Sequence, residues 1–67
     1  MLLMFKDQFG DERFVAEVAD EREANVEMMD YIHKLNPSYE VHYVRSWGEE
    51  PVIYDVGSHS EFFHLYK

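Results

Sequence analysis

The chain contains no cysteine, so neither disulfides nor thiolate metal clusters can stabilise its fold. Basic residues are scarce: six Lys and Arg stand against 14 Asp and Glu, which gives a formal net charge of −8. This charge argues against direct nucleic-acid binding and favours a protein partner, for which a basic surface would be complementary. No apolar run approaches the ~20 residues of a membrane helix, and the opening residues lack the pattern of a signal peptide. We therefore expect a cytoplasmic protein with no membrane contact.

What the chain does contain is enough apolar material for a packed fold. Hydrophobic residues make up 46% and aromatic residues 16%, unlike disordered chains of high charge. With 67 residues we expect a single domain over residues 1–67. A domain of this size buries only roughly 60% of the surface of its unfolded chain, so a dense aromatic core or self-association must stabilise it.

One segment has the clear pattern of a helix, from about Asp20 to Leu35. Asp20 and Glu23 have the spacing of a capping box, and the following apolar residues recur at the helical period. This apolar stripe consists of Ala24, Met28, Tyr31, Ile32 and Leu35. Asn36 is suited to a left-handed residue after the helix, and Pro37 prevents its continuation.

The rest of the chain has the alternation typical of strands. Strands are predicted over Leu2–Lys6, Arg13–Ala19, Tyr39–Trp47, Val52–Val56 and Glu61–Tyr66. The short connection between the first two favours an antiparallel hairpin. The order ββαβββ predicts an α+β two-layer sandwich with one helix packed on a mainly antiparallel sheet. Its predicted core comprises Phe5, Phe14, Val18, Met28, Ile32, Leu35, Val41, Tyr43, Val52, Tyr54 and one of Phe62 or Phe63.

The four histidines raise the question of a metal site. His59 and His64 are close in the sequence, and Asp55 or Glu61 could add a carboxylate. Zinc sites, however, usually combine two closely spaced pairs of ligands, and the other two histidines lie on different predicted elements. We expect no metal, although a small metal-dependent hydrolase built on these histidines remains a weaker alternative.

A catalytic triad could be imagined from Ser58, His59, Ser60 and Asp55. Residues adjacent in the sequence cannot in general face one another in hydrogen-bond geometry, and the chain has no Gly-x-Ser-x-Gly elbow. A hairpin turn explains this segment better. We therefore expect no catalytic residue, no cofactor and no enzymatic activity.

Carboxylates are concentrated in one part of the sequence. Eight of the 14 lie in a short run: Asp11, Glu12, Glu17, Asp20, Glu21, Glu23, Glu27 and Asp30. The ordinary interpretation is a solvated surface that keeps the protein soluble. The alternative is a surface that mimics nucleic acid and inhibits a host DNA- or RNA-binding enzyme, for which Glu23, Glu27 and Asp30 on the helix are the candidate residues.

The chain has more aromatic residues than one helix can cover. Trp47, Phe63 and Tyr66 are therefore candidate contact residues. Stacking on single-stranded nucleic acid is a weaker interpretation, because such sites are lined with Lys and Arg. A homodimer formed by antiparallel pairing of edge strands would cover the aromatic surface.

The run from Val52 to Leu65, with its Gly57-Ser58-His59-Ser60 turn and its paired Phe62 and Phe63, resembles the endings of short uncharacterised proteins of phages and prophages of Gram-positive bacteria. The resemblance implies a small acidic cytoplasmic protein of a mobile element, a class in which inhibitors of host proteins are frequent. The leading hypothesis is thus a non-enzymatic protein-interaction module of phage or prophage type.

Overall fold

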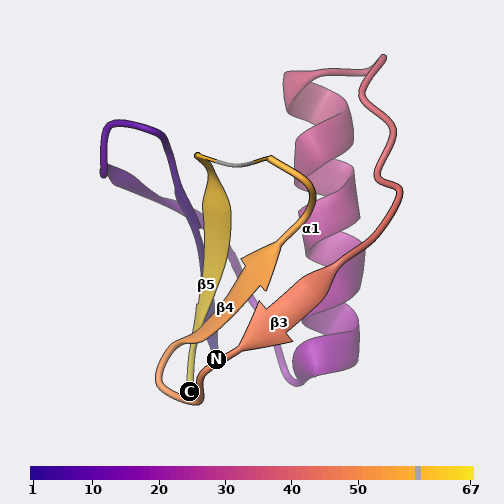
Figure 1. Cartoon of the computed structure of the whole chain (residues 1–67). Coiled ribbons are helices and arrows are strands. Elements are labelled where there is room, and N and C mark those ends of the chain that lie inside the picture. The colour runs from indigo at the N-terminus through magenta and orange to yellow at the C-terminus, as the bar shows by residue number, and fades with distance from the viewer. Residues whose placement is uncertain (59) are drawn as a thin grey trace.

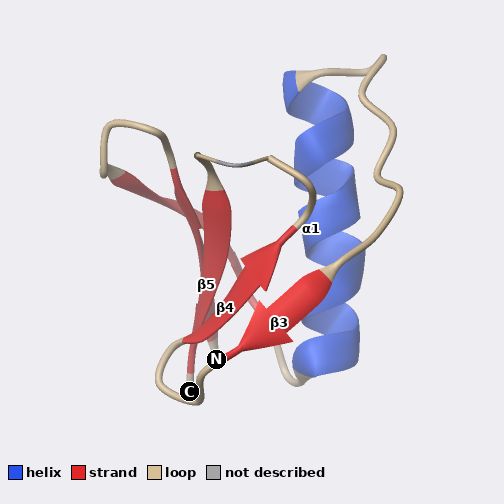
Figure 2. Ribbon diagram, in the orientation of Figure 1, coloured by secondary structure: helices blue, strands red, loops and turns tan. Residues whose placement is uncertain are grey.

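The computed structural model describes residues 1–58 and 60–67 and shows a five-stranded antiparallel sheet with one helix across one face (Figures 1 and 2). Its elements are β1 (Leu2–Lys6), β2 (Glu12–Glu17), α1 (Glu21–Leu35), β3 (Arg45–Trp47), β4 (Val52–Asp55) and β5 (Phe62–Tyr66). The strand order is β2-β1-β5-β4-β3, and every pair is antiparallel. The predicted α+β class and element order are confirmed.

Helix α1 begins where the sequence places it. The side chain of Asp20 accepts a hydrogen bond from the N–H of Glu23 at 2.8 Å, which satisfies one of the free amides of the first turn. At the other end, Asn36 donates its N–H to the carbonyl of Ile32 at 2.9 Å. Its φ of −148° is negative, so the predicted left-handed conformation of Asn36 is wrong.

The inner face of the sheet, which packs against α1, carries the core. Leu3, Phe5, Val52, Tyr54, Phe63 and Leu65 are buried there beneath Ala24, Met28 and Ile32 of the helix. The ring of Phe5 lies 5.2 Å from those of Tyr31 and Phe63, centroid to centroid. Leu35 is an exception, since it stands in the last turn of α1, is 56% exposed and borders a hollow, so its predicted place in the core is wrong.

A hydrogen bond between Tyr54 and Glu21 ties the first turn of the helix to the sheet. The hydroxyl of Tyr54 donates to Oε1 of Glu21 at 3.0 Å from beneath the helix. Burial of the phenol, together with this bond to a carboxylate, raises the pKa of Tyr54 to about 12.

Among the described residues, no helix has the length and apolar character needed to cross a membrane.

A bulge in β2 moves Phe14 out of the core. Leu3 pairs with Ala16, whereas Met4 pairs with Phe14, so Val15 is the extra residue of the β2 strand. The alternation of side chains restarts after this residue, which places Phe14 on the opposite face from Ala16. Phe14 is 61% exposed, and its predicted place in the core is therefore wrong.

The longest predicted strand is mostly not a strand. Only Arg45–Trp47 pairs with β4, and residues 39–44 run beside α1 instead (Figure 1). Strand β4 ends at Asp55, the partner of Arg45, so residues 39–44 have no strand residue of β4 opposite them. Val41 packs partly buried against the core, but Tyr43 is 45% exposed, which overturns its core prediction.

Candidate functional site

The face of the sheet that points away from α1 is here called the open face. By strand alternation it carries Leu2, Met4, Lys6, Glu12, Phe14, Glu17, Arg45, Trp47, Ile53, Asp55, Phe62, His64 and Tyr66. Figure 2 shows the helix on the other side of the sheet, and no described element covers this one. An uncovered sheet face with this many apolar side chains is unusual for a monomer.

One row of side chains crosses the open face from edge to edge. The strand register brings Phe14, Met4, His64, Ile53 and Trp47 side by side, one from each strand. The two aromatic ends are 61% and 47% exposed, and the three residues between them are partly buried. The row therefore reads aromatic, aliphatic, histidine, aliphatic, aromatic.

Further aromatic side chains extend this row. The ring of Phe62 meets that of Trp47 edge to face at 6.2 Å. Together with Ile53, His64 and Lys6, these two rings border a shallow hollow of about 420 Å³ beside the β1–β2 turn. The open face is thus uneven, with a hollow that side chains of another surface can enter.

The open face carries little of the net charge of the chain. Its charged residues are Glu12, Glu17 and Asp55 against Lys6 and Arg45, which leaves −1 of the total −8. The remaining −7 includes Arg13 on the inner face of β2 and otherwise lies on α1, the turns, the connecting segments and the C-terminal Lys67. A surface that is apolar and nearly neutral can approach another copy of itself without strong repulsion.

His64 stands at the centre of the row, and its surroundings disfavour its protonation. Burial lowers the pKa of this imidazole, Lys6 acts in the same direction, and Glu12 opposes them. Nδ1 of His64 lies 3.5 Å from the hydroxyl of Tyr66, which itself donates to both carboxylate oxygens of Glu12 at 2.9 Å. The bond to Glu12 raises the pKa of Tyr66.

Two of the three predicted aromatic contact residues lie on this surface. Trp47 is half-exposed at the edge of the open face and Tyr66 is partly buried on it. Phe63 is fully buried on the inner face, so its prediction as a contact residue is wrong, while its alternative place in the core is confirmed. The sequence interpretation missed Phe14, because no residue pattern in β2 marks the bulge.

The predicted acidic residues are divided between two regions. Asp11 and Glu12 lie at the turn end of β2, and Glu17 lies at its other end, about 17 Å away by strand geometry. On α1, Glu23 and Asp30 are exposed and Glu27 is partly buried. Asp30 pairs with Lys34 at 3.0 Å, which reduces the charge that this helix surface presents.

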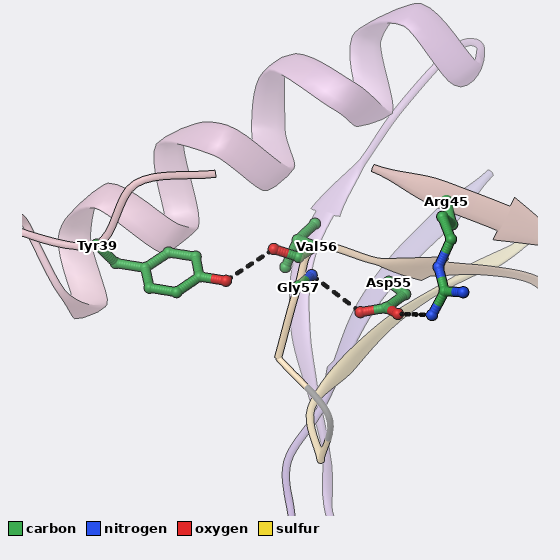
Figure 3. Close-up of polar contacts among 5 residues, drawn as sticks. All are labelled: Tyr39, Arg45, Asp55, Val56 and Gly57. Atoms are coloured by element: carbon green, nitrogen blue, oxygen red, sulfur yellow. Dashed lines mark hydrogen bonds and ion pairs between the residues drawn. The ribbon is translucent and has the colours of Figure 1, made fainter. Parts of the chain in front are cut away.

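Asp55 is the most deeply buried charged residue described. Its Oδ2 accepts a hydrogen bond from Nη2 of Arg45 at 2.6 Å, and its Oδ1 accepts one from the N–H of Gly57 at 2.9 Å (Figure 3). The bond to Asp55 is the main reason that the pKa of Arg45 is raised. This carboxylate therefore joins β3, β4 and the turn that follows β4.

Within residues 1–58 and 60–67, no group of three His, Asp or Glu side chains could hold a metal ion. His59 lies outside the described residues, and with it the His59–His64 pair and the Ser58-His59-Ser60 triad.

Comparison with families of known proteins, with curated proteins and with solved structures found no match.

Proposed function

We propose that this chain is a non-enzymatic protein-interaction module, and that its open face binds a second copy of the chain. The observation that carries the proposal is the row of five side chains, one from each strand, that no described element covers. An apolar surface of this kind is ordinarily a contact site.

The row has the symmetry that a homodimer requires. In a two-fold dimer with its axis parallel to the strands through His64, Phe14 of each copy lies over Trp47 of the other, and the two histidines face each other. Such an interface is self-complementary, because each contact occurs twice. The near-neutral charge of the open face supports this arrangement, since the acidic residues of α1 point outward in both copies.

Face-to-face packing is better supported than pairing of edge strands. Edge strand β3 has three residues, and β2 carries a bulge and the charged residues Glu12, Arg13 and Glu17, all of which discourage edge pairing. Five strands spaced ~4.8 Å apart and ~17 Å long span roughly 400 Å² in projection on each copy, about 800 Å² for both, which is below the ~1,200 Å² of standard specific interfaces and in the range of weak, transient ones. We therefore expect a dissociation constant in the micromolar range.

Sedimentation velocity tests this proposal directly. The wild-type chain should be largely dimeric at about 100 μM, a concentration well above a micromolar dissociation constant, and the Phe14→Ser/Trp47→Ser variant should be monomeric at the same concentration. The control is Phe9→Ser/Val26→Ser, which removes two apolar side chains that are 81% and 62% exposed but lie off the open face. Dimers in the control and monomers in the test variant support the proposal. A wild-type chain that stays monomeric would overturn it.

The cellular role that we propose is binding of a host protein in the cytoplasm. The resemblance of the segment Val52–Leu65 to phage and prophage proteins supports this setting, and the absence of cysteine fits a reducing compartment. A dimer joined through its open faces would display two α1 helices on its outer surfaces. Their excess of acidic residues would suit a basic partner.

A nucleic-acid mimic is the second candidate function, supported by the placement of Glu23, Glu27 and Asp30 on one outward helix. Adjacent members of this set are separated by ~6 and ~4.5 Å along the helix axis, which is a lower charge density than the one phosphate per ~3.4 Å of a DNA strand. Replacing all three by Lys should abolish capture of a basic nucleic-acid enzyme from a Gram-positive lysate, whereas capture that DNA and salt fail to displace would contradict this function.

A further inference from the structure

A pocket unrelated to the open face lies on the helix side of the sheet. It is lined by residues of the last turn of α1, by Asn36 and Tyr39 of the segment that follows, and by Val56, Ser58 and Glu61, and its volume is about 200 Å³. Its floor is made by Phe5, Ile32 and Phe63, which are at most 8% exposed, and Leu35 forms one side. The interior is therefore apolar, and it reaches the core of the fold.

One wall of the pocket is held in place by specific contacts. The hydroxyl of Tyr39 donates to the carbonyl of Val56 at 2.8 Å (Figure 3). Gly57 permits this approach, because a Cβ there would lie 2.9 Å from the Tyr39 oxygen, and its φ of +97° favours glycine. The carboxylate of Asp55 in turn accepts a hydrogen bond from the N–H of Gly57. The ring of Tyr39 is thus positioned before any ligand arrives.

The lining of the pocket includes a carboxylate. Glu61 is partly buried there and accepts a hydrogen bond from the hydroxyl of Ser58 at 3.4 Å. No Lys or Arg of the described chain lies within ion-pair distance of Glu61. An acidic group in the lining of a mainly apolar pocket favours a ligand with a cationic end and an apolar end.

We propose that this pocket binds a small primary amine that carries a phenyl-sized apolar group. The apolar group would fill the space above Phe5 and Phe63, and the ammonium would lie against the Glu61 carboxylate. The size is appropriate, because an apolar cavity of ~150 Å³ accommodates one benzene ring. Drug-sized ligands need about 300 Å³ or more, which this pocket does not offer. The proposal is independent of the dimer.

The test is a titration followed by amide chemical shifts, with phenethylamine as the probe. Phenethyl alcohol and 3-phenylpropionate serve as its neutral and anionic counterparts. We expect millimolar binding of the amine, with shifts centred on Ile32, Tyr39 and Val56. At low salt the amine should bind about two- to fivefold more tightly than the alcohol, the range of a solvent-accessible ion pair, and the anion should bind most weakly.

Two substitutions assign the binding to its parts. Glu61→Gln should remove the preference for the amine while leaving the affinity of the alcohol unchanged, and Glu23→Gln, at the far end of α1, should change neither. Tyr39→Phe should weaken all three probes by a similar factor, because the wall loses its anchor to Val56. Shifts confined to the open face, no shifts with 10 mM phenethylamine, or an amine preference that survives Glu61→Gln would each overturn the proposal.

Discussion

The two faces of the sheet are built from similar residues, yet only one of them is covered. Leu3, Phe5 and Phe63 on the inner face are 0–7% exposed beneath α1, whereas Phe14 and Trp47 on the open face are 61% and 47% exposed. A single helix can bury one face of a sheet and no more. The apolar residues left on the other face exceed what the fold of one chain needs, and this surplus is the main evidence for an interaction surface.

The largest effect expected from this comparison is on core packing. Phe63→Ala should lower the free energy of unfolding by about 3–5 kcal/mol, because it leaves a cavity beneath the helix. Phe14→Ala should change that of the monomer by about 0.5 kcal/mol or less, as is usual for surface sites. Urea denaturation at low micromolar concentration, where the proposed dimer is dissociated, measures both. Equal losses would show that the open face is also part of the core.

A smaller effect is expected at the end of the open face, where Asp55 is buried. Asp55→Asn should destabilise the fold by about 1–3 kcal/mol, because the buried site loses its charge-assisted bonds to Arg45 and to the N–H of Gly57. Thermal unfolding of this variant beside Asp11→Asn, an exposed site in the β1–β2 turn, provides the comparison. A variant as stable as Asp11→Asn would argue against a structural role for this carboxylate.

The inner face should also determine the alkaline limit of stability. The pKa of Tyr54 is raised from 10.0 to about 12 in the folded chain, so the unfolded chain releases this proton first. Its contribution to stability is therefore fully present below pH 10 and is lost as the pH rises towards 12. Denaturation midpoints across this range should fall less steeply in Tyr54→Phe. If the denaturation midpoints of wild type and Tyr54→Phe fall equally steeply with pH, Tyr54 is not the group responsible for the loss of stability.

The open face should produce the smallest effect, at acidic pH. Because the pKa of His64 is lowered in the folded state, the unfolded chain binds the proton first, near the ordinary value of 6.5. The contribution of neutral His64 to the free energy of unfolding is therefore fully present above pH 6.5. It is lost as the pH drops from 6.5 through the lower pKa of His64 in the folded chain. Lys6, Glu12 and Tyr66 surround this imidazole and are unchanged in His64→Gln. That variant should show a shallower decline between pH 7 and pH 5, and an identical decline would assign the effect to other groups.

Sequence patterns were most successful where structure depends on neighbours along the chain. The bounds of β1 agree with the predicted strand, and Asp20 caps α1 as its spacing to Glu23 predicted. The predicted strand over Tyr39–Trp47 failed despite its clear alternation, because most of it has no partner strand. Of the predicted contact residues, Trp47 and Tyr66 lie on the open face. Phe63 is buried on the inner face instead, because side chains alternate along β5 and its neighbour Phe62 takes the open face.

The sequence by itself determined the helix, its N-terminal cap, the burial of Ala24, Met28 and Ile32 and the ββαβββ order, since each of these depends on contacts or periodicities within a few residues. Only the tertiary structure decided which aromatic side chains remain outside. Phe14 became exposed because Val15 forms a bulge against β1, and Phe63 became buried because it lies on the face of β5 that packs beneath α1, whereas Phe62 lies on the open face. Strand partners and register are set by contacts between distant parts of the chain, and local periodicity carries no information about them.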